Sequence, residues 1–373
     1  MTRRSALVAT NQLGVIGGSE VVALEWTKLL QAFGFEVEVF ANWLGEPMRS
    51  LFRTKTGVEP TTEPGAVRPF RHDLVYAQHQ TLPLFDYAPA ADDRTATRII
   101  LGRLSRRHYL ESGGWATDRL LADLVLANSA LTEEHLTALG MPVPILNFRN
   151  GAPPDFFHPF AAKPKRPQNI LVVSNHAEPT LVEAAGWLRR LARVRWVGRK
   201  RGKAMLVEPE MIRAQDLVIG IGKTVQYALT ARIPVFVYDH FGGPGYLRPG
   251  NIEAAERFSF SGRCCERRRD GRTLAEEIMG DYRSGVAFAR SVPDSWLARF
   301  DLKGVVETAI GGPAGDNIVR RARLAADPMF GQEVLLAHYV REEYREKLES
   351  RGSLVSRTWR RLRTRLAGGY GGS

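Results

Sequence analysis

Cysteine is scarce in this sequence: there are two, Cys264 and Cys265, and they are neighbours. Neighbouring cysteines rarely form a disulfide with each other, because the bond needs a larger Cα separation than one peptide step gives. No third or fourth ligand lies around this pair at the spacing of a zinc motif. The scarcity argues against a disulfide-stabilised secreted scaffold. We therefore expect two reduced thiols, a cytoplasmic protein, and no bound metal or other cofactor.

Long apolar runs are also missing. No stretch approaches the roughly 20 apolar residues that a membrane-spanning helix needs. The basic start at residues 1–4 is followed by a short apolar run at 5–10, which is typical of a first strand and too short for a secretory signal. The 373 residues, 44% of them hydrophobic and 25% charged, are enough for two globular α/β domains.

Acidic residues are missing from segment 351–373, which contains six arginines. This segment accounts for half of the net charge of +12, so the rest of the chain is only mildly basic and specific nucleic-acid binding is not indicated. Val355, Trp359, Leu362 and Leu366 recur in it at helical spacing and would form an apolar stripe. The segment resembles an anchor on an anionic membrane surface, which would place the protein peripherally on the inner face of the membrane; a solvated tail is the alternative.

Short β-rich runs alternate with amphipathic helical segments in two successive blocks, which is the pattern of parallel α/β sheets. A polar, proline-bearing stretch at 161–168 separates the blocks and is predicted to be a linker. We expect a Rossmann-like domain at 1–160 and a second one at 169–325. A C-terminal helix is expected at 326–350, with the option of packing back on the first domain.

A glycine-rich segment lies between the first predicted strand and the first predicted helix. Gly14, Gly17 and Gly18 allow backbone N–H groups to approach a ligand, and the helix start adds partial positive charge. The spacing does not match the G-x-G-x-x-G fingerprint of dinucleotide-binding proteins, which argues against a nicotinamide oxidoreductase. We expect this loop to approach a diphosphate or a sugar hydroxyl; a tight turn capped by Ser19 is the alternative.

His79 lies at the carboxyl end of the predicted strand 73–79. Open α/β sheets bind their ligands at this edge, and an imidazole there can accept a proton or hydrogen-bond a sugar. His79 is therefore the candidate catalytic residue, with a purely structural histidine as the alternative.

The letters Gly-Lys-Thr at 222–224 suggest a P-loop, but the glycine that the motif requires five residues earlier is Leu217. A P-loop is therefore excluded. The turn at Gly222, Lys223 and Thr224 still offers N–H groups, an ammonium and a hydroxyl to an anion. An ordinary strand–turn–helix corner is the alternative.

Residues 239–246 follow another predicted strand and contain three glycines and a proline. Such a density of special residues favours a shaped loop over a simple connection. We expect Asp239, His240, Gly243 and Tyr246 to face the cleft between the two domains.

These segments, in this order, resemble GT-B glycosyltransferases of the large retaining class that uses nucleotide sugars, and the resemblance covers nearly the whole chain. Residues 17–20 and 33–39 are similar to the opening motifs of that class. Residues 126–129 and 147–151, followed by 157–159, are similar to the motifs that precede its interdomain linker.

The resemblance implies an α/β fold of two Rossmann-like domains facing each other across a cleft, with C-terminal helices. It also implies metal-independent transfer, with retention, of a sugar from a nucleotide-sugar donor to a glycan or lipid-linked acceptor, as in cell-envelope or polysaccharide biosynthesis. On this reading the loop at 14–18 approaches the donor phosphates or the acceptor, and His79 lies near the transferred sugar. Residues 222–228 hold the phosphates and ribose of the nucleotide.

The sequence also departs from that class. Its paired glutamates correspond here to Val218 and Gln226, and Gln226 can hydrogen-bond a ribose but brings no charge. Asn175 and its neighbour stand where a basic residue is usual, so positive charge for the diphosphate would come from Lys223 or from the basic run 199–203. A non-catalytic GT-B-like protein that binds a nucleotide or a sugar is therefore the alternative function.

Overall fold

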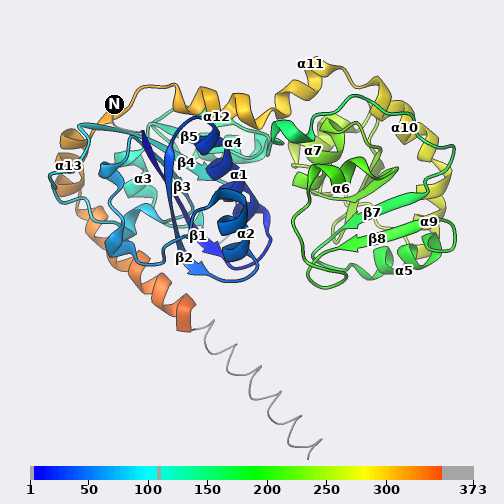
Figure 1. Ribbon diagram of the computed structural model, residues 1–373, viewed down its shortest axis with the longest axis horizontal. Coiled ribbons are helices and arrows are strands. Elements are labelled where there is room, and N and C mark those ends of the chain that lie inside the picture. Colours follow the sequence, from blue (N-terminus) through cyan, green and yellow to red (C-terminus); the bar gives the residue numbers. More distant parts are fainter. Residues whose placement is uncertain (1–3, 107–110, 347–373) are drawn as a thin grey trace, which may run out of the picture.

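The computed structural model describes residues 4–106 and 111–346, which form two α/β domains side by side along the long axis of the molecule (Figure 1). The first sheet has the strand order β2-β1-β3-β4-β5-β6, and the second has the order β11-β10-β9-β7-β8. Neighbouring strands are parallel in both sheets except at β12, which joins β4, and at β11, which joins β10. The predicted GT-B-like fold of two Rossmann-like domains is therefore confirmed.

The first domain has helices on both faces of its sheet. Its strands are β1 (Ser5–Leu13), β2 (Glu36–Leu44), β3 (Leu74–Gln78), β4 (Ala96–Arg103), β5 (Leu124–Ala127) and β6 (Ile145–Asn147). Its helices include α1 (Gly18–Ala32), α2 (Met48–Thr56), α3 (Trp115–Leu121) and α4 (Ala130–Ala138). In β1, Ala6 and Val8 point into one core while Leu7 and Ala9 point into the other, which explains the continuous apolar run of this strand.

The second domain begins directly after residues 161–168, which contain no helix or strand. Its strands are β7 (Asn169–Val173), β8 (Arg193–Val197), β9 (Leu217–Gly220), β10 (Val235–Asp239) and β11 (Gly242–Tyr246). Its helices are α5 (Pro179–Leu188), α6 (Pro209–Arg213), α7 (Lys223–Thr230), α8 (Ile252–Arg257), α9 (Gly271–Gly280), α10 (Tyr282–Ser291) and α11 (Asp294–Leu297).

The chain returns to the first domain earlier than predicted. Helix α12 (Leu302–Ile310) places Leu302, Val306 and Ala309 in the same core as α1, and β12 (Gly315–Asp316) pairs with β4. Helix α13 (Asn317–Ala326) follows on the same domain. The predicted end of the second domain at residue 325 is therefore wrong, because the apolar stripe of α12 covers α1 and not the second sheet.

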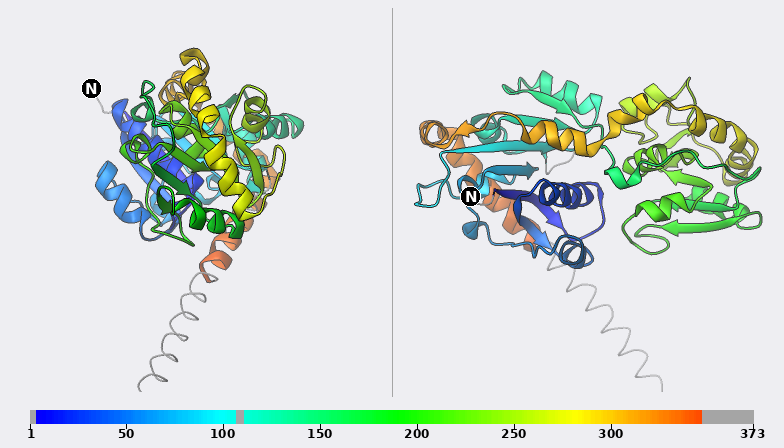
Figure 2. Two further views of the ribbon diagram at one scale, coloured as in Figure 1. Left: turned by 90° about the vertical axis from the view of Figure 1, so that its right-hand side faces the viewer. Right: turned by 45° about the horizontal axis from the view of Figure 1, so that its top comes forward.

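The segment 328–346 is helical and lies against the first domain (Figure 2). Glu333 accepts hydrogen bonds from the backbone N–H groups of Ala116 at 2.9 Å and Thr117 at 2.8 Å. The ring of Tyr344 packs on Trp43, with 4.2 Å between centroids. The predicted C-terminal helix at 326–350 thus packs back on the first domain over its described part.

The predicted membrane anchor at 351–373 lies outside the described residues. Within the described ranges, no helix combines the length and the apolar character that crossing a membrane requires.

Candidate functional site

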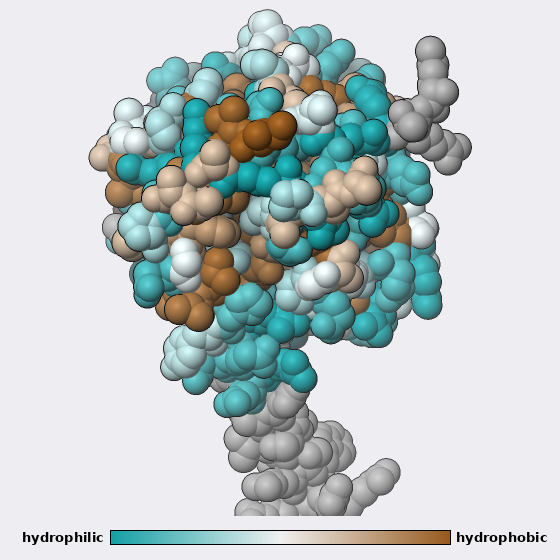
Figure 3. All heavy atoms as spheres, turned by 90° about the vertical axis from the view of Figure 1, so that its left-hand side faces the viewer, coloured by the Kyte–Doolittle hydropathy of each residue, from teal (hydrophilic) through white to brown (hydrophobic). Residues whose placement is uncertain are grey.

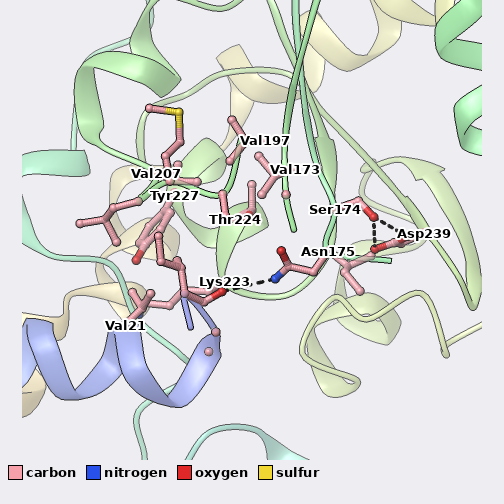
Figure 4. Close-up of a pocket in the computed structure, with 18 of the residues that line it drawn as sticks. Val21, Val173, Ser174, Asn175, Val197, Val207, Lys223, Thr224, Tyr227 and Asp239 are labelled. Atoms are coloured by element: carbon pink, nitrogen blue, oxygen red, sulfur yellow. Dashed lines mark hydrogen bonds between the residues drawn. The ribbon is translucent and has the colours of Figure 1, made fainter. Parts of the chain in front are cut away.

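A pocket of about 250 Å³ lies between the two domains, at the carboxyl ends of their parallel strands (Figure 4). The first domain contributes Ile16, Gly17, Gly18 and Val21, from the loop after β1 and the first turn of α1. Ligands of open α/β sheets bind at this edge of a sheet, and here the edges of two sheets share one cavity. This pocket is therefore the candidate functional site.

The second domain provides an apolar wall and a polar wall. The apolar wall consists of Val173, Val197, Ala204, Met205, Leu206, Val207, Ile221 and Tyr227. The polar wall consists of Gly198, Ser174, Asn175, His176, Lys223, Thr224 and Asp239. In Figure 4, Val197, Val207 and Tyr227 lie on one side of the pocket and Ser174 and Asp239 on the other. The pocket thus has room for a ligand with one apolar and one polar part.

The first turn of α1 lines this pocket and has no side-chain cap on its N-cap residue. Gly17 is the N-cap residue, no side chain caps the helix, and the Ser19 hydroxyl bonds to Glu20 instead. Glu20 folds back over the turn, so that a Cβ on Gly17 would lie 2.6 Å from its Oε2 atom. Of the three glycines singled out in the sequence, Gly17 and Gly18 line the pocket, whereas Gly14 is not among its lining residues. The alternative of a turn capped by Ser19 is wrong.

Lys223, at the start of α7, lines the pocket but is held by the domain interface. Its ammonium lies 2.8 Å from Oε2 of Glu25 in α1 and donates to the carbonyl oxygens of Gly151 at 2.5 Å and Asn150 at 3.3 Å. Burial raises the pKa of Glu25, and the charge of Lys223 acts against this rise. All three N–H donors of the ammonium therefore have partners within the protein. A ligand in the pocket would contact the backbone of the turn and Thr224 instead.

Gln226 does not reach this pocket. Its side chain is buried, and its amide Nε2 donates to the carbonyl oxygen of Arg149 at 3.1 Å. Gln226 lines a separate cavity on the other side of α7, together with Asn147 and Arg149. Gly222, the N-cap of α7 with φ of +59°, also lies outside the set of pocket residues. The orientation of α7 thus directs the Gln226 side chain toward the segment that precedes the linker. Gln226 therefore points away from the pocket in which the sequence had placed it beside a ribose.

Asp239 lies at the end of β10 and is the centre of a polar group. Its carboxylate is 1% exposed and accepts a hydrogen bond from the Ser174 hydroxyl, with 3.0 Å to Oδ1 and 3.1 Å to Oδ2. Nδ1 of His176 lies 3.4 Å and Nδ1 of His240 lies 3.9 Å from Oδ2 of Asp239. Burial, followed by the nearby His176, lowers the pKa of His240. Asp239 lines the pocket between the two domains.

Asn175 follows Ser174 after β7 and connects the two domains. Its Nδ2 lies 3.5 Å from the carbonyl oxygen of Ile16, and this contact is drawn as a dashed line in Figure 4. Asn175 was predicted at the site, whereas Ser174 was not. The position of Ser174 directly after a buried strand, at the same sheet edge as Asp239, is the signal that could have identified it.

Gly243 and Tyr246 do not face the cleft. Residues 242–246 form β11, which pairs antiparallel with β10 and is not a loop. Tyr246 is buried, and its hydroxyl donates to the carbonyl oxygen of Ile278 at 2.7 Å. Positive φ angles at Gly242 and Gly245, +75° and +81°, fit the tight turn and the bend of this hairpin. The glycines that suggested a binding loop therefore shape a hairpin.

His79 is buried at the end of β3, with φ of +61°. Its Nδ1 atom lies 3.3 Å from the backbone nitrogen of Asn11, which donates to it. His79 is not among the residues that line the interdomain pocket. This geometry agrees with a structural histidine, and the catalytic role stays a prediction.

No family model matches the chain, and no curated protein matches it. Solved structures that are similar include a glycosyltransferase from Rickettsia africae, with 13% identity, 90% of this chain and 99% of that chain covered, and a TM-score of 0.47. The S. aureus protein MnaA, solved together with UDP, has 11% identity, coverage of 82% and 94%, and a TM-score of 0.45. The UDP-GlcNAc 2-epimerase from Methanocaldococcus jannaschii has 10% identity, coverage of 83% and 98%, and a TM-score of 0.45.

Proposed function

We propose that the interdomain pocket binds a nucleotide sugar and that the chain transfers its sugar to a glycan or lipid-linked acceptor. One observation carries the proposal: the first turns of α1 and α7, from opposite domains, line the same pocket, and an apolar wall lies beside them. A nucleoside diphosphate has matching parts, because it joins a flat heterocyclic base to a negatively charged diphosphate.

The helix starts are the proposed diphosphate site. The first N–H groups of a helix have no partner within the helix, and the helix dipole adds partial positive charge at that end. Gly17 and Gly18 offer such groups from α1, and Lys223 and Thr224 offer them from α7. Because the Lys223 ammonium is paired with Glu25, backbone dipoles would carry more of the binding than in a site with a free lysine.

The apolar wall is the proposed base site. Val173, Val197 and Val207 come from three separate segments of the second domain, and Tyr227 closes the wall next to them. Ligand pockets of this kind are mostly apolar and have a few polar groups that fix orientation. The base would lie on the second domain, and the diphosphate would span the gap toward α1.

The departing nucleotide diphosphate would be stabilised by these preorganised N–H groups, which act most strongly where water is excluded. No step of this proposal uses a metal. Three further parts of the proposal rest on the resemblance of the sequence. They are retention of configuration, the role of His79 near the transferred sugar, and a place in envelope or polysaccharide biosynthesis.

The acceptor side of the proposal is supported by an exposed apolar surface on the first domain. Figure 3 shows apolar patches among polar side chains at this end of the molecule. Helix α13 and the helix at 328–346 expose Ile318 by 70%, Leu335 by 67% and Tyr339 by 62%. These helices precede the arginine-rich segment 351–373, so apolar and basic groups adjoin along the chain. An anionic membrane carrying a lipid-linked acceptor fits both kinds of group.

One observation favours the alternative of a non-catalytic nucleotide- or sugar-binding protein. α7 presents no free charge to the pocket, because Lys223 is paired with Glu25 and the neutral side chain of Gln226 is turned away. Such a protein would bind the nucleotide and leave it intact.

Calorimetric titrations with UDP, GDP, ADP and dTDP, and with their sugar conjugates, test the proposal. We expect one nucleotide to bind clearly better than the others, and its sugar conjugate to lose the sugar when an acceptor lipid extract is added. Mass spectrometry of the products separates transfer to an acceptor from hydrolysis, from rearrangement of the sugar, and from binding without turnover. Absence of binding by every nucleotide would overturn the proposal.

A further inference from the structure

Three side chains with metal-ligating atoms meet beside the pocket, and two of them, His176 and Asp239, belong to its polar wall. His176 follows β7, Asp239 ends β10 and His240 is the next residue. One ligand atom of each lies within 4.8 Å of the other two, and this is the one such group of three among residues 4–106 and 111–346. The sequence did not predict it, because 63 residues separate His176 from Asp239 and no metal motif has this spacing.

The distances suit shared coordination better than hydrogen bonding. Nδ1 of His176 lies 3.4 Å from Oδ2 of Asp239, which is long for a hydrogen bond to a carboxylate. Ligand atoms at about 2.0–2.1 Å from a tetrahedral Zn²⁺ are roughly 3.4 Å apart, which matches this separation. Nδ1 of His240 lies 3.9 Å from the same oxygen, so His240 would have to move toward Asp239 to complete the coordination shell.

His240 provides a second, independent observation. Its Nδ1 atom is buried and has no hydrogen-bond partner among the described residues, although it is directed toward Asp239. A buried polar atom without a partner costs free energy, and a bound cation would supply the missing partner. The centroids of the two imidazole rings lie 3.7 Å apart at an interplanar angle of 31°, so the rings of His176 and His240 pack against each other.

The surroundings of Asp239 hold its carboxylate in place. The Ser174 hydroxyl donates a hydrogen bond to Asp239. Oγ of Ser174 also accepts hydrogen bonds from the backbone N–H groups of His176 at 3.2 Å and Ala177 at 3.3 Å. Ser174 therefore fixes both the carboxylate and the turn that carries His176. Metal ligands in proteins are oriented by outer hydrogen bonds of this type.

We propose that His176, Asp239 and His240 form a binding site for Zn²⁺ or a similar late first-row divalent cation. Two imidazoles and one carboxylate suit such ions, whereas Mg²⁺ and Ca²⁺ prefer oxygen ligands throughout. Three protein ligands leave a fourth position open, and His176 and Asp239 line the pocket, so the open position is accessible to a ligand there. The proposal does not depend on the proposed function, because the cation needs no nucleotide.

Titration of Zn²⁺ into the full chain, without an affinity tag and after treatment with a chelator, tests the site. We expect one ion per chain by calorimetry, and the intense visible absorption of tetrahedral cobalt when Co²⁺ replaces Zn²⁺. His176→Gln and His240→Gln should each weaken Zn²⁺ binding by at least about tenfold, since even outer-shell changes cost about that much. His158→Gln is the matched control, because His158 is exposed and is not part of the group.

The vicinal thiols are the other candidate for soft metals, and a Cys264→Ser/Cys265→Ser variant separates the two sites. The proposal requires that this variant keep the high-affinity ion. It is overturned if the ion is lost with the cysteines and kept in both histidine variants, or if the unaltered chain binds Zn²⁺ no more tightly than those variants do. Circular dichroism melting of each variant establishes that the histidine replacements, one of which is at an exposed residue, leave the fold intact.

Discussion

Lys223 of α7 and Glu25 of α1 form a buried ion pair that joins the two domains beside the pocket. The Nζ–Oε2 distance is 2.8 Å, and the two side chains are 9% and 8% exposed. The Tyr227 hydroxyl donates to the second oxygen of Glu25. The pair fixes the start of α7 against α1, and these are the two helices whose first turns line the pocket.

Removing one partner of this pair should strongly destabilise the chain. Lys223→Met leaves Glu25 buried without its cation, and breaking a buried pair in this way costs about 3–5 kcal/mol. The double variant Lys223→Met/Glu25→Gln should recover much of this loss, because no uncompensated charge remains. Urea unfolding of the three proteins measures the difference in free energy of unfolding.

A second ion pair provides the matched control. Lys55 of α2 and Glu208, just before α6, are 2.9 Å apart and also connect the domains, but they are 39% and 35% exposed. Solvent screening limits such a pair to about 0–1 kcal/mol, so Lys55→Met should change the free energy of unfolding little. An equal decrease in the free energy of unfolding in the Lys223 and Lys55 variants would contradict the assigned role of the buried pair.

Tyr246→Phe separates a structural role from a role in the site. The variant loses the hydrogen bond from the hydroxyl to the Ile278 carbonyl and should lower the free energy of unfolding by about 1 kcal/mol. Nucleotide affinity should stay unchanged, because Tyr246 is in the core of the second domain. Weaker nucleotide binding with an unchanged free energy of unfolding would contradict this structural role and would support the prediction that Tyr246 faces the cleft.

The stability of the first domain should fall as the pH rises through neutrality. Burial, opposed by Arg103, raises the pKa of Glu111 from 4.5 to about 7. Because the pKa in the folded state is the higher one, the stabilising contribution is complete below pH 4.5 and is lost as the pH rises through 7. The decrease in free energy of unfolding from pH 5 to pH 8 should include roughly 1–3 kcal/mol from this group, at about 1.4 kcal/mol per pKa unit.

Glu111→Gln should remove that part of the pH dependence and keep an oxygen to accept the N–H group of Leu104. Glu59→Gln, at an exposed glutamate, is the control and should leave the pH profile as it is. Urea midpoints at pH 5, 6, 7 and 8 provide the comparison. A Glu111→Gln profile that follows the unaltered chain would show that this carboxyl does not titrate as described.

Binding to anionic vesicles should need both the arginine-rich segment and the exposed apolar helix face. Truncation after residue 350 should reduce sedimentation with phosphatidylserine-containing vesicles, and Leu335→Ser/Leu336→Ser should reduce it further. Neutral phosphatidylcholine vesicles are the control and should retain little protein. Equal sedimentation of the full chain and the truncated chain would contradict membrane binding by the arginine-rich segment.

Much of the fold could be predicted from the sequence because its signals are local. The apolar run of β1 points into two cores, and the glycines after it mark where the chain leaves the sheet. The return of the chain at α12 could not be predicted, because an apolar stripe shows that a helix face is buried but not which domain covers it. Leu302 and Val306 therefore fell within the wrong predicted domain.

The candidate site was predicted where residues directly follow strands and missed where long-range contacts decide the outcome. Gly17, Thr224 and Asp239 line the pocket because strand ends and helix starts can be read from the sequence. The pairing of Lys223 with Glu25 joins residues 198 positions apart and leaves no local pattern. The direction of a single side chain on α7 depends on how that helix rests against the segment before the linker.

Calorimetric titration of the preferred nucleotide into a Gly18→Asp variant tests the central claim most directly. Gly18 begins α1 at the pocket, and a Cβ there meets open space, so the fold should tolerate the change while the carboxylate repels a diphosphate. Gly250→Asp is the matched control, because it adds the same charge at an exposed glycine with equal space. We predict that Gly18→Asp weakens binding by at least about tenfold, or roughly 1.4 kcal/mol, and that Gly250→Asp does not. Equal affinities in the two variants would contradict the claim that the pocket between the domains holds the diphosphate.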